Sequence, residues 1–314
     1  MKRRHFLKSG LASSTAFALS GITALTPRHA QAATVNITLR AEGAYKTLID
    51  GSSIFVWQFR DMNGISGPGA LTSALLVKEG DTVNVTIENR IDRPVKFDIN
   101  GVTLSTTLSV NSGSNRIYSF TAPAAGSYMY TDSHNGELGR AMGLAGPMVV
   151  MPSSSNNRLY NNGPTFNRQY TLFMSELDDR LNTAIESGST YNMDDYEPNY
   201  YFANGLSYPE TTSRSDTLIS MNLGENVAIR FINGGAITYP MHFHGYHVNV
   251  ATRNRKIETR IIEKDTVQVN RNECVDVILP VVQRGAYPLH THYVPGVTAN
   301  GSYANGGLII MSAS

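Results

Sequence analysis

The 314-residue chain has only one cysteine, Cys274. A single thiol cannot form a disulfide within the chain, so hydrophobic burial has to stabilise the fold. Long apolar runs are absent as well: after residue 32 no stretch of 18 apolar residues occurs, which predicts that the rest of the chain has no membrane span. A length of 314 residues is enough for two domains with separate cores.

Charge of either sign is scarce. The chain holds 26 basic and 25 acidic residues, a net charge of +1. Residues 1–32 contain five basic and no acidic residues, so the remainder has 21 basic against 25 acidic residues and a net charge of −4. This balance indicates neither nucleic acid nor an anionic membrane as a partner.

The first 32 residues have the pattern of an export signal. A basic start at residues 2–8 (KRRHFLK) precedes a moderately apolar stretch at 10–25 and a small-x-small cleavage pattern at 30–32. The paired arginines followed by Phe-Leu-Lys resemble a twin-arginine signal. We therefore expect a periplasmic or secreted protein and leave residues 1–32 out of the fold prediction.

The remaining residues predict β structure. Short runs rich in Val, Ile, Thr and Tyr recur between Gly, Asn, Asp and Pro every 8–12 residues or so, which is typical of sandwiches and barrels. Residues 176–201 are acidic and rich in Tyr and Asn, and predict an excursion with a short helix. The predicted strands are Thr34–Leu39, Leu75–Val77, Thr82–Glu88, Ser114–Phe120, Gly146–Met151, Gln169–Met174, Thr217–Asn222, Asn226–Ile232, His247–Val250, Thr266–Val269, Cys274–Leu279 and Gly307–Met311.

Two domains are expected. Residues 153–167 are polar and rich in Asn, Ser, Gly and Pro, which predicts a linker between domains 33–152 and 168–314. The halves also resemble each other: residues 77–83 match 221–227, and 125–128 match 284–287. A repeat of about 150 residues suggests duplication of one β-sandwich domain.

Histidine is concentrated in three clusters. Of the eight histidines, six lie beyond residue 32, at 134, 242, 244, 247, 290 and 292. Because residues i and i+2 of a strand point to one face, His242 projects with His244, and His290 with His292. Two such strands side by side would direct four imidazoles to one point, as a metal site requires. His247 is interpreted as a strand residue near this site.

These motifs resemble the multicopper oxidase family, in particular two-domain members such as small laccases and copper nitrite reductases. The most specific stretches are Tyr239–Val248, Gly285–Tyr293, Tyr201–Gly205 and Gly143–Pro147. The resemblance implies an all-β fold of two cupredoxin-like Greek-key β-sandwich domains, with copper at the interface between domains.

The chain departs from the family at the type 1 blue copper site, which requires a cysteine thiolate. Thr291 stands where the family has that cysteine, Tyr239 and Tyr303 stand at histidine positions, and Leu308 stands at the axial position. The remaining thiol, Cys274, lies on a predicted strand and is interpreted as a core residue. The resemblance therefore implies that no type 1 copper is present. Tyr130, Tyr239, Tyr293 and Tyr303 are interpreted as core aromatics.

The family's ligand pattern implies one intact three-histidine site made of His134, His244 and His290. A second, weaker metal site or a proton-transfer role is left for His242 and His292, together with three residues at lost histidine positions, namely Asp98, Asn100 and Asp132. Three neutral imidazoles with an open position suit copper, and zinc as well.

Three functions remain open. The favoured one is a copper-dependent oxidoreductase acting on oxygen species or a small-molecule substrate, with carboxylates near the metal orienting water or moving a proton. The others are a non-catalytic copper-binding protein for sequestration, and a copper-free scaffold. The ligand pattern joins domain 1 to domain 2, and two-domain relatives meet this need by forming trimers. We therefore expect a homotrimer with sites between subunits.

Overall fold

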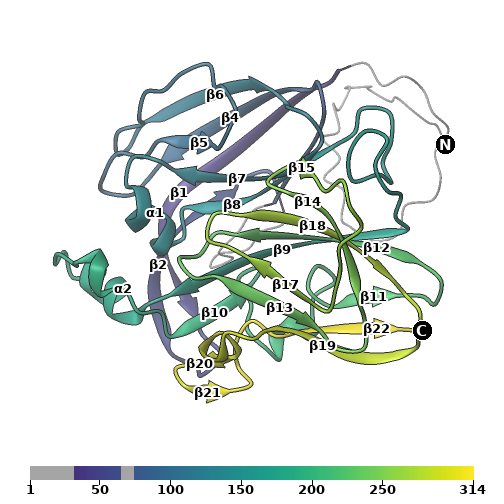
Figure 1. Ribbon diagram of the computed structural model, residues 1–314. Helices are drawn as coiled ribbons and strands as arrows, with labels where there is room; N and C mark the ends of the chain where they lie inside the picture. Colours follow the sequence, from purple (N-terminus) through teal and green to yellow (C-terminus); the bar gives the residue numbers. More distant parts are fainter. Residues whose placement is uncertain (1–31, 65–73) are drawn as a thin grey trace, which may run out of the picture.

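The computed structural model describes residues 32–64 and 74–314, which fold into two β-sandwiches (Figure 1). Within these residues the α-helices are α1 (Gly136–Met142) and α2 (Asp179–Glu186), both short. The all-β prediction is therefore confirmed, and α2 is the short helix expected within residues 176–201. The proposed signal lies outside the described residues except for Ala32. No helix in the described part is long and apolar enough to cross a membrane.

The first sandwich pairs two four-stranded sheets. Along the strand β4 the buried residues are Val83, Val85 and Ile87, which alternate with more exposed neighbours as expected for a strand with one face in a core. One sheet has the order β2 (Ser53–Asp61), β1 (Thr34–Thr47), β4 (Thr82–Asn89), β6 (Asn115–Thr121). The other has the order β3 (Leu75–Lys78), β8 (Ala145–Met151), β7 (Gly126–Asp132), β5 (Phe97–Ile99).

The second sandwich pairs a five-stranded sheet with a nine-stranded one. The smaller sheet has the order β11 (Ile219–Met221), β22 (Ile309–Ala313), β19 (Gly285–Thr291), β13 (Tyr239–Phe243), β17 (Thr266–Val269). The larger follows β15 (Lys256–Ile257), β14 (Val248–Arg253), β18 (Cys274–Pro280), β12 (Asn226–Asn233), β9 (Arg168–Leu177), β10 (Tyr200–Ala203), β20 (Thr298–Ala299), β21 (Ser302–Tyr303), with β16 (Glu263–Lys264) paired to β14. Three 3-10 turns, η1 (Met193–Asp195), η2 (Glu210–Thr212) and η3 (Val294–Val297), lie between strands.

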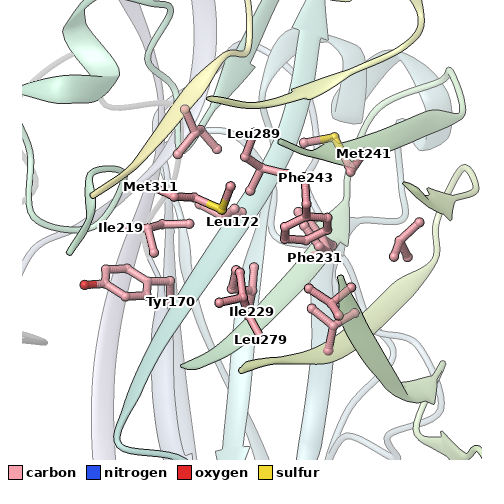
Figure 2. Close-up of a cluster of buried hydrophobic side chains, with 14 of the residues drawn as sticks. Tyr170, Leu172, Ile219, Ile229, Phe231, Met241, Phe243, Leu279, Leu289 and Met311 are labelled. Atoms are coloured by element: carbon pink, nitrogen blue, oxygen red, sulfur yellow. The ribbon is translucent and has the colours of Figure 1, made fainter. Parts of the chain in front are cut away.

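The core of the second sandwich determines where the histidines lie. On β13 Tyr239, Met241 and Phe243 are buried, whereas Pro240 and His242 are on the opposite, partly exposed face. Figure 2 shows Met241 and Phe243 among the apolar side chains of this core. Burying the apolar set of a strand fixes the orientation of the alternate set. The histidines are therefore held on the outer face of the smaller sheet.

The two sandwiches share an extensive interface. Ser127 on β7 donates a hydrogen bond to Asp276 on β18 (2.5 Å), and Asp276 also accepts from Thr252 (2.8 Å) and pairs with Arg230 on β12 (3.4 Å). Arg230 and Asp276 are almost fully buried. A buried ion pair requires such additional hydrogen bonds because each charge has lost its water. These contacts hold the sandwiches in one relative orientation.

Residues 153–167, the predicted linker, are packed against this interface. Leu159 is fully buried and Phe166 nearly so, in an apolar cluster that also contains Val149, Ala228 and Ile278. Arg158 and Thr165 form an isolated β-bridge. Polar residues dominate this stretch, which is why the sequence predicted a loose linker. The apolar side chains of Leu159 and Phe166 are nevertheless enough to anchor it against the sandwiches.

Several strands were not predicted from the sequence. Strand β2 was missed because its residues Val56–Phe59 are all buried and show no alternation, and β7 because it begins with a glycine of a turn signal. The interpretation of Tyr303 as a core aromatic was wrong, since its side chain is 76% exposed in the short β21. Tyr130 and Tyr239 are fully buried, and Tyr293 is partly buried.

Candidate metal site

Four histidines from β13, β19 and the residues that follow them lie together, and we call them the four-histidine cluster: His242, His244, His290 and His292. His242 is directly opposite His290 in the antiparallel pair. The ring centroids of His242 and His292 are 4.5 Å apart, those of His242 and His244 4.7 Å, and those of His244 and His290 5.0 Å. The predicted convergence of two H-x-H pairs is therefore present in the structure.

The nitrogen positions fit a shared metal ion. The Nε2 atoms of His244 and His290 are 2.9 Å apart. Two imidazole nitrogens, each about 2.0–2.1 Å from one metal, would be separated by about 2.9 Å in the right-angled arrangement that Cu(II) prefers. In this structure the two atoms form a hydrogen bond, in which one ring donates a proton that a bound metal would displace.

Neighbouring groups orient the rings. His290 Nδ1 lies 3.0 Å from the carbonyl oxygen of Thr291, which only accepts, so Nδ1 carries the proton and the lone pair is on Nε2. His242 Nδ1 is 2.9 Å from Thr266 Oγ1, a hydroxyl that either donates or accepts, so this contact orients the ring without fixing its tautomer. Metal-ligating histidines characteristically have such a partner on the other ring nitrogen.

The electrostatics of the cluster favour a neutral ring at His244. The pKa of His244 is lowered, mainly by burial and further by the proximity of His290, His242 and His292. A second positive charge among four close rings would be repelled. Because only the neutral ring can bind a metal, this shift keeps His244 in the ligand form at lower pH than an isolated histidine.

His134 lies apart from the cluster. It is exposed, directly after β7, and its Nδ1 is 3.0 Å from Ser109 Oγ. In residues 32–64 and 74–314 of a single chain, no three or more His, Cys, Asp or Glu side chains are grouped so as to hold a metal ion. This applies to the proposed set of His134, His244 and His290, which is not assembled within one chain. It also applies to the four-histidine cluster, in which the Nε2 atoms of His244 and His290 are 2.9 Å apart.

Asp132 shapes the turn that presents His134. It is 1% exposed, and its Oδ1 accepts hydrogen bonds from the backbone N–H groups of Lys96 and His134, both at 2.9 Å. Its Oδ2 accepts from Asn135 Nδ2 at 2.6 Å. With both oxygens engaged, Asp132 holds the loop in place. Asp98, on β5, is partly buried, and Asn100 is exposed in the turn that follows.

Comparison with known families decides the identity. One multicopper oxidase model matches residues 61–155 and a second matches residues 180–304, which together cover most of the chain.

The chain belongs to the multicopper oxidase family.

Solved structures of this type share the fold. The blue copper oxidase from Nitrosomonas europaea superposes with a TM-score of 0.76 at 23% identity, over 89% of this chain and 86% of that one. The copper nitrite reductase from Nitrosomonas europaea gives 0.68 at 20% identity, over 90% and 94%. A comparison with curated protein sequences gave no match. These neighbours confirm two cupredoxin-like β-sandwiches. Membership of the family implies copper binding, and zinc finds no support in the comparisons.

In this multicopper oxidase the positions expected for type 1 copper carry other contacts. Tyr239 is fully buried and donates a hydrogen bond to Glu176 Oε2 at 2.5 Å. Thr291 is buried and accepts from the backbone N–H of Tyr293. Leu308 is 7% exposed. Cys274 is buried on β18, where burial raises the pKa of its thiol to about 12. A single protonated thiol at this place agrees with the lack of a type 1 site.

Glu176, which contacts Tyr239 at one of the positions expected for type 1 copper, was not identified from the sequence. It is buried at the end of β9 and accepts hydrogen bonds from Tyr239 and from the backbone N–H of Ala236. A Cβ atom at Gly235 would collide with its carboxyl group, so the loop at 234–236 is shaped around this acid. The only signal in the sequence is an acidic residue two positions after the predicted strand Gln169–Met174.

Replacing Glu176 by glutamine should change how stability depends on pH. Burial raises the pKa of Glu176 above its ordinary 4.5, so the folded chain binds this proton more tightly than the unfolded chain. The contribution of Glu176 to the free energy of unfolding is therefore complete at pH values below its pKa in the unfolded chain. It declines as the pH rises toward its pKa in the folded chain. Glutamine does not titrate. We expect the free energy of unfolding of Glu176→Gln, relative to wild type, to increase with pH.

Urea unfolding at several pH values between about 4.5 and 7.5 measures this difference. Glu137→Gln, at a side chain that is 59% exposed, is the matched control and should give a nearly constant difference. A difference for Glu176→Gln that is constant or decreases with pH would contradict the prediction.

Proposed function

We propose that this chain is an exported copper-dependent oxidoreductase that acts through the four-histidine cluster and lacks a type 1 blue copper. The observation that supports it most directly is the 2.9 Å separation of two imidazole nitrogens inside a group of four rings. Ordinary surface or core histidines have no reason to converge in this way, since four adjacent rings raise the cost of protonating any one of them.

The residues of the chain have distinct parts in this proposal. His244 and His290 would hold the metal through Nε2, with His242 and His292 beside them. Bound copper would supply one-electron redox chemistry and act as a Lewis acid toward an oxygen species or a small substrate. Asp132 is already occupied by the turn before His134, so Asp98 is the domain 1 carboxylate left to orient water or move a proton.

The site is completed in this proposal by a second subunit. His134 is exposed and contacts Ser109, while the four-histidine cluster is at the outer face of the other sandwich. If His134 of one subunit faces the cluster of the next, the contact is between different surfaces, and such contacts close into rings. A homotrimer with three equivalent sites satisfies this geometry.

Copper should stabilise the folded protein. A ligand that binds only the folded state adds about 2.7 kcal/mol at a hundredfold excess over Kd. The effect should disappear as pH falls through roughly 5 to 7, because a protonated imidazole cannot bind the metal. Thermal unfolding with and without copper, at pH values on both sides of this range, measures it.

The copper-loaded protein should also lack intense blue absorption, which requires a thiolate.

Two results would contradict the metal assignment: an unchanged melting temperature with copper at neutral pH, or an intense blue band that persists in Cys274→Ser. Turnover of a panel of phenols with oxygen or peroxide then separates an oxidoreductase from a sequestration protein. Copper binding without turnover would favour the latter.

A further inference from the structure

A cavity of about 190 Å³ lies between the two sandwiches. The first sandwich contributes α1 and residues next to it, and the second contributes β9, the loop at 234–236 and Arg271. This cavity is distinct from the four-histidine cluster, whose residues do not line it. Its polar groups are unusual enough to indicate a ligand.

Arg140 is the first of these groups. Its guanidinium is partly buried on α1 and donates to the side-chain oxygen of Asn272. No carboxylate of the described residues lies within 4.0 Å of it, in contrast to Arg271, which is paired with Glu137. Burial lowers the pKa of Arg140 despite the opposing effect of Glu137 and Glu176, so this partly desolvated cation is incompletely compensated and creates a favourable place for an anion.

Ser175 is the second polar group of the cavity. Ser175 lines the cavity, and its Oγ atom is buried and has no hydrogen-bond partner among the described residues. An unsatisfied buried hydroxyl costs free energy, so such a group in a folded protein calls for an explanation. A ligand oxygen in the cavity would accept its proton.

Glu176 does not oppose an anion here. Its carboxyl oxygens already accept hydrogen bonds from Tyr239 and from the backbone N–H of Ala236, and burial raises its pKa. The remaining lining includes the ion pair of Glu137 and Arg271 and an apolar wall with Val56, Met142 and Phe173. The cavity therefore combines hydrogen-bond donors for an anion with a surface for a hydrophobic body.

The volume of the cavity limits the size of its ligand. A cavity of about 150 Å³ lined by apolar groups accommodates benzene. About 190 Å³ thus fits one ring with a small substituent. We propose that this cavity binds a small monocyclic carboxylate, with its carboxylate facing Arg140 and Ser175 and its ring against the apolar wall.

Isothermal titration of the full-length, chelator-treated protein with benzoate tests the proposal. Benzamide has the same shape without the charge, benzylamine reverses the charge, and acetate lacks the ring. We expect saturable 1:1 binding of benzoate, at least about tenfold weaker binding of benzamide and acetate, and none of benzylamine. Equal affinities for benzoate and benzamide would overturn the proposal, as would no heat with benzoate.

Three variants locate the binding. Arg140→Gln removes the cation, Ser175→Ala removes the free hydroxyl, and Ala141→Leu fills the cavity from α1 without changing charge. Each should weaken benzoate binding, Arg140→Gln by about tenfold or more. Arg214→Gln and Ala184→Leu, which lie outside this cavity, are the matched controls.

Circular dichroism and thermal unfolding establish that each variant is folded before titration. Wild-type affinity in both Arg140→Gln and Ala141→Leu would place benzoate elsewhere and overturn the proposal. The measurement needs no copper, so its outcome is independent of the copper-dependent function proposed above.

Discussion

Replacing His244 and His290 together by alanine is expected to abolish tight copper binding. The two Nε2 atoms are 2.9 Å apart, and both would be lost. Removing a residue that merely orients a metal ligand typically costs 10–100-fold in affinity, so loss of two ligands should exceed about 100-fold. Equilibrium titration with copper against a competing chelator measures the change.

His247→Ala is the matched control for this double variant. His247 is exposed on the same stretch of chain and is not part of the four-histidine cluster. It should keep wild-type affinity and wild-type stability in the metal-free state. Copper binding by the double variant at wild-type strength would show that the metal is held elsewhere.

The same variants test whether sites are shared between subunits. His134→Ala alone and the His244→Ala/His290→Ala double variant should each bind copper weakly. When the two are mixed under conditions that allow subunit exchange, some interfaces regain His134 from one chain and the other histidines from its neighbour. Recovery of tight binding supports the intersubunit site. No recovery, or a monomeric mass for the copper-bound protein, contradicts it.

Asp276→Ala is expected to destabilise the protein by about 3–5 kcal/mol. The substitution leaves the fully buried Arg230 guanidinium without its carboxylate at the interface between the sandwiches, and it also removes the acceptor of Ser127 and Thr252. An uncompensated buried charge is far more costly than the absence of both partners. Urea unfolding gives the free energy.

Two further variants make this prediction sharper. The double variant Arg230→Met/Asp276→Leu should recover much of the lost stability, because neither charge remains to be buried. Asp216→Ala removes one partner of a surface pair with Arg214 at 2.5 Å and should cost less than about 1 kcal/mol. Equal losses for Asp276→Ala and Asp216→Ala would mean that the interface pair has no special role.

The sequence alone determined the β class of the fold and the orientation of each H-x-H pair, because both depend on local periodicity, whereas the pairing of β13 with β19 brings the two pairs together. Alternation over two residues places His242 with His244, and His290 with His292, on one face whatever the details of packing. The presence of a short helix within residues 176–201 followed from composition, while its bounds came from the structure. The family resemblance at Thr291, with Cys274 as the single thiol, predicted that no thiolate would lie beside the histidines.

The tertiary structure decided the buried polar contacts and the position of His134, since these involve groups far apart in the chain. Glu176 meets Tyr239 63 residues later, and Ser127 meets Asp276 149 residues later. Such contacts depend on how one sheet lies against another, which no short-range pattern encodes. The same reason explains why His134 could be identified as a ligand type but not placed: its position relative to the other histidines is set by packing between sandwiches, and in our proposal between subunits.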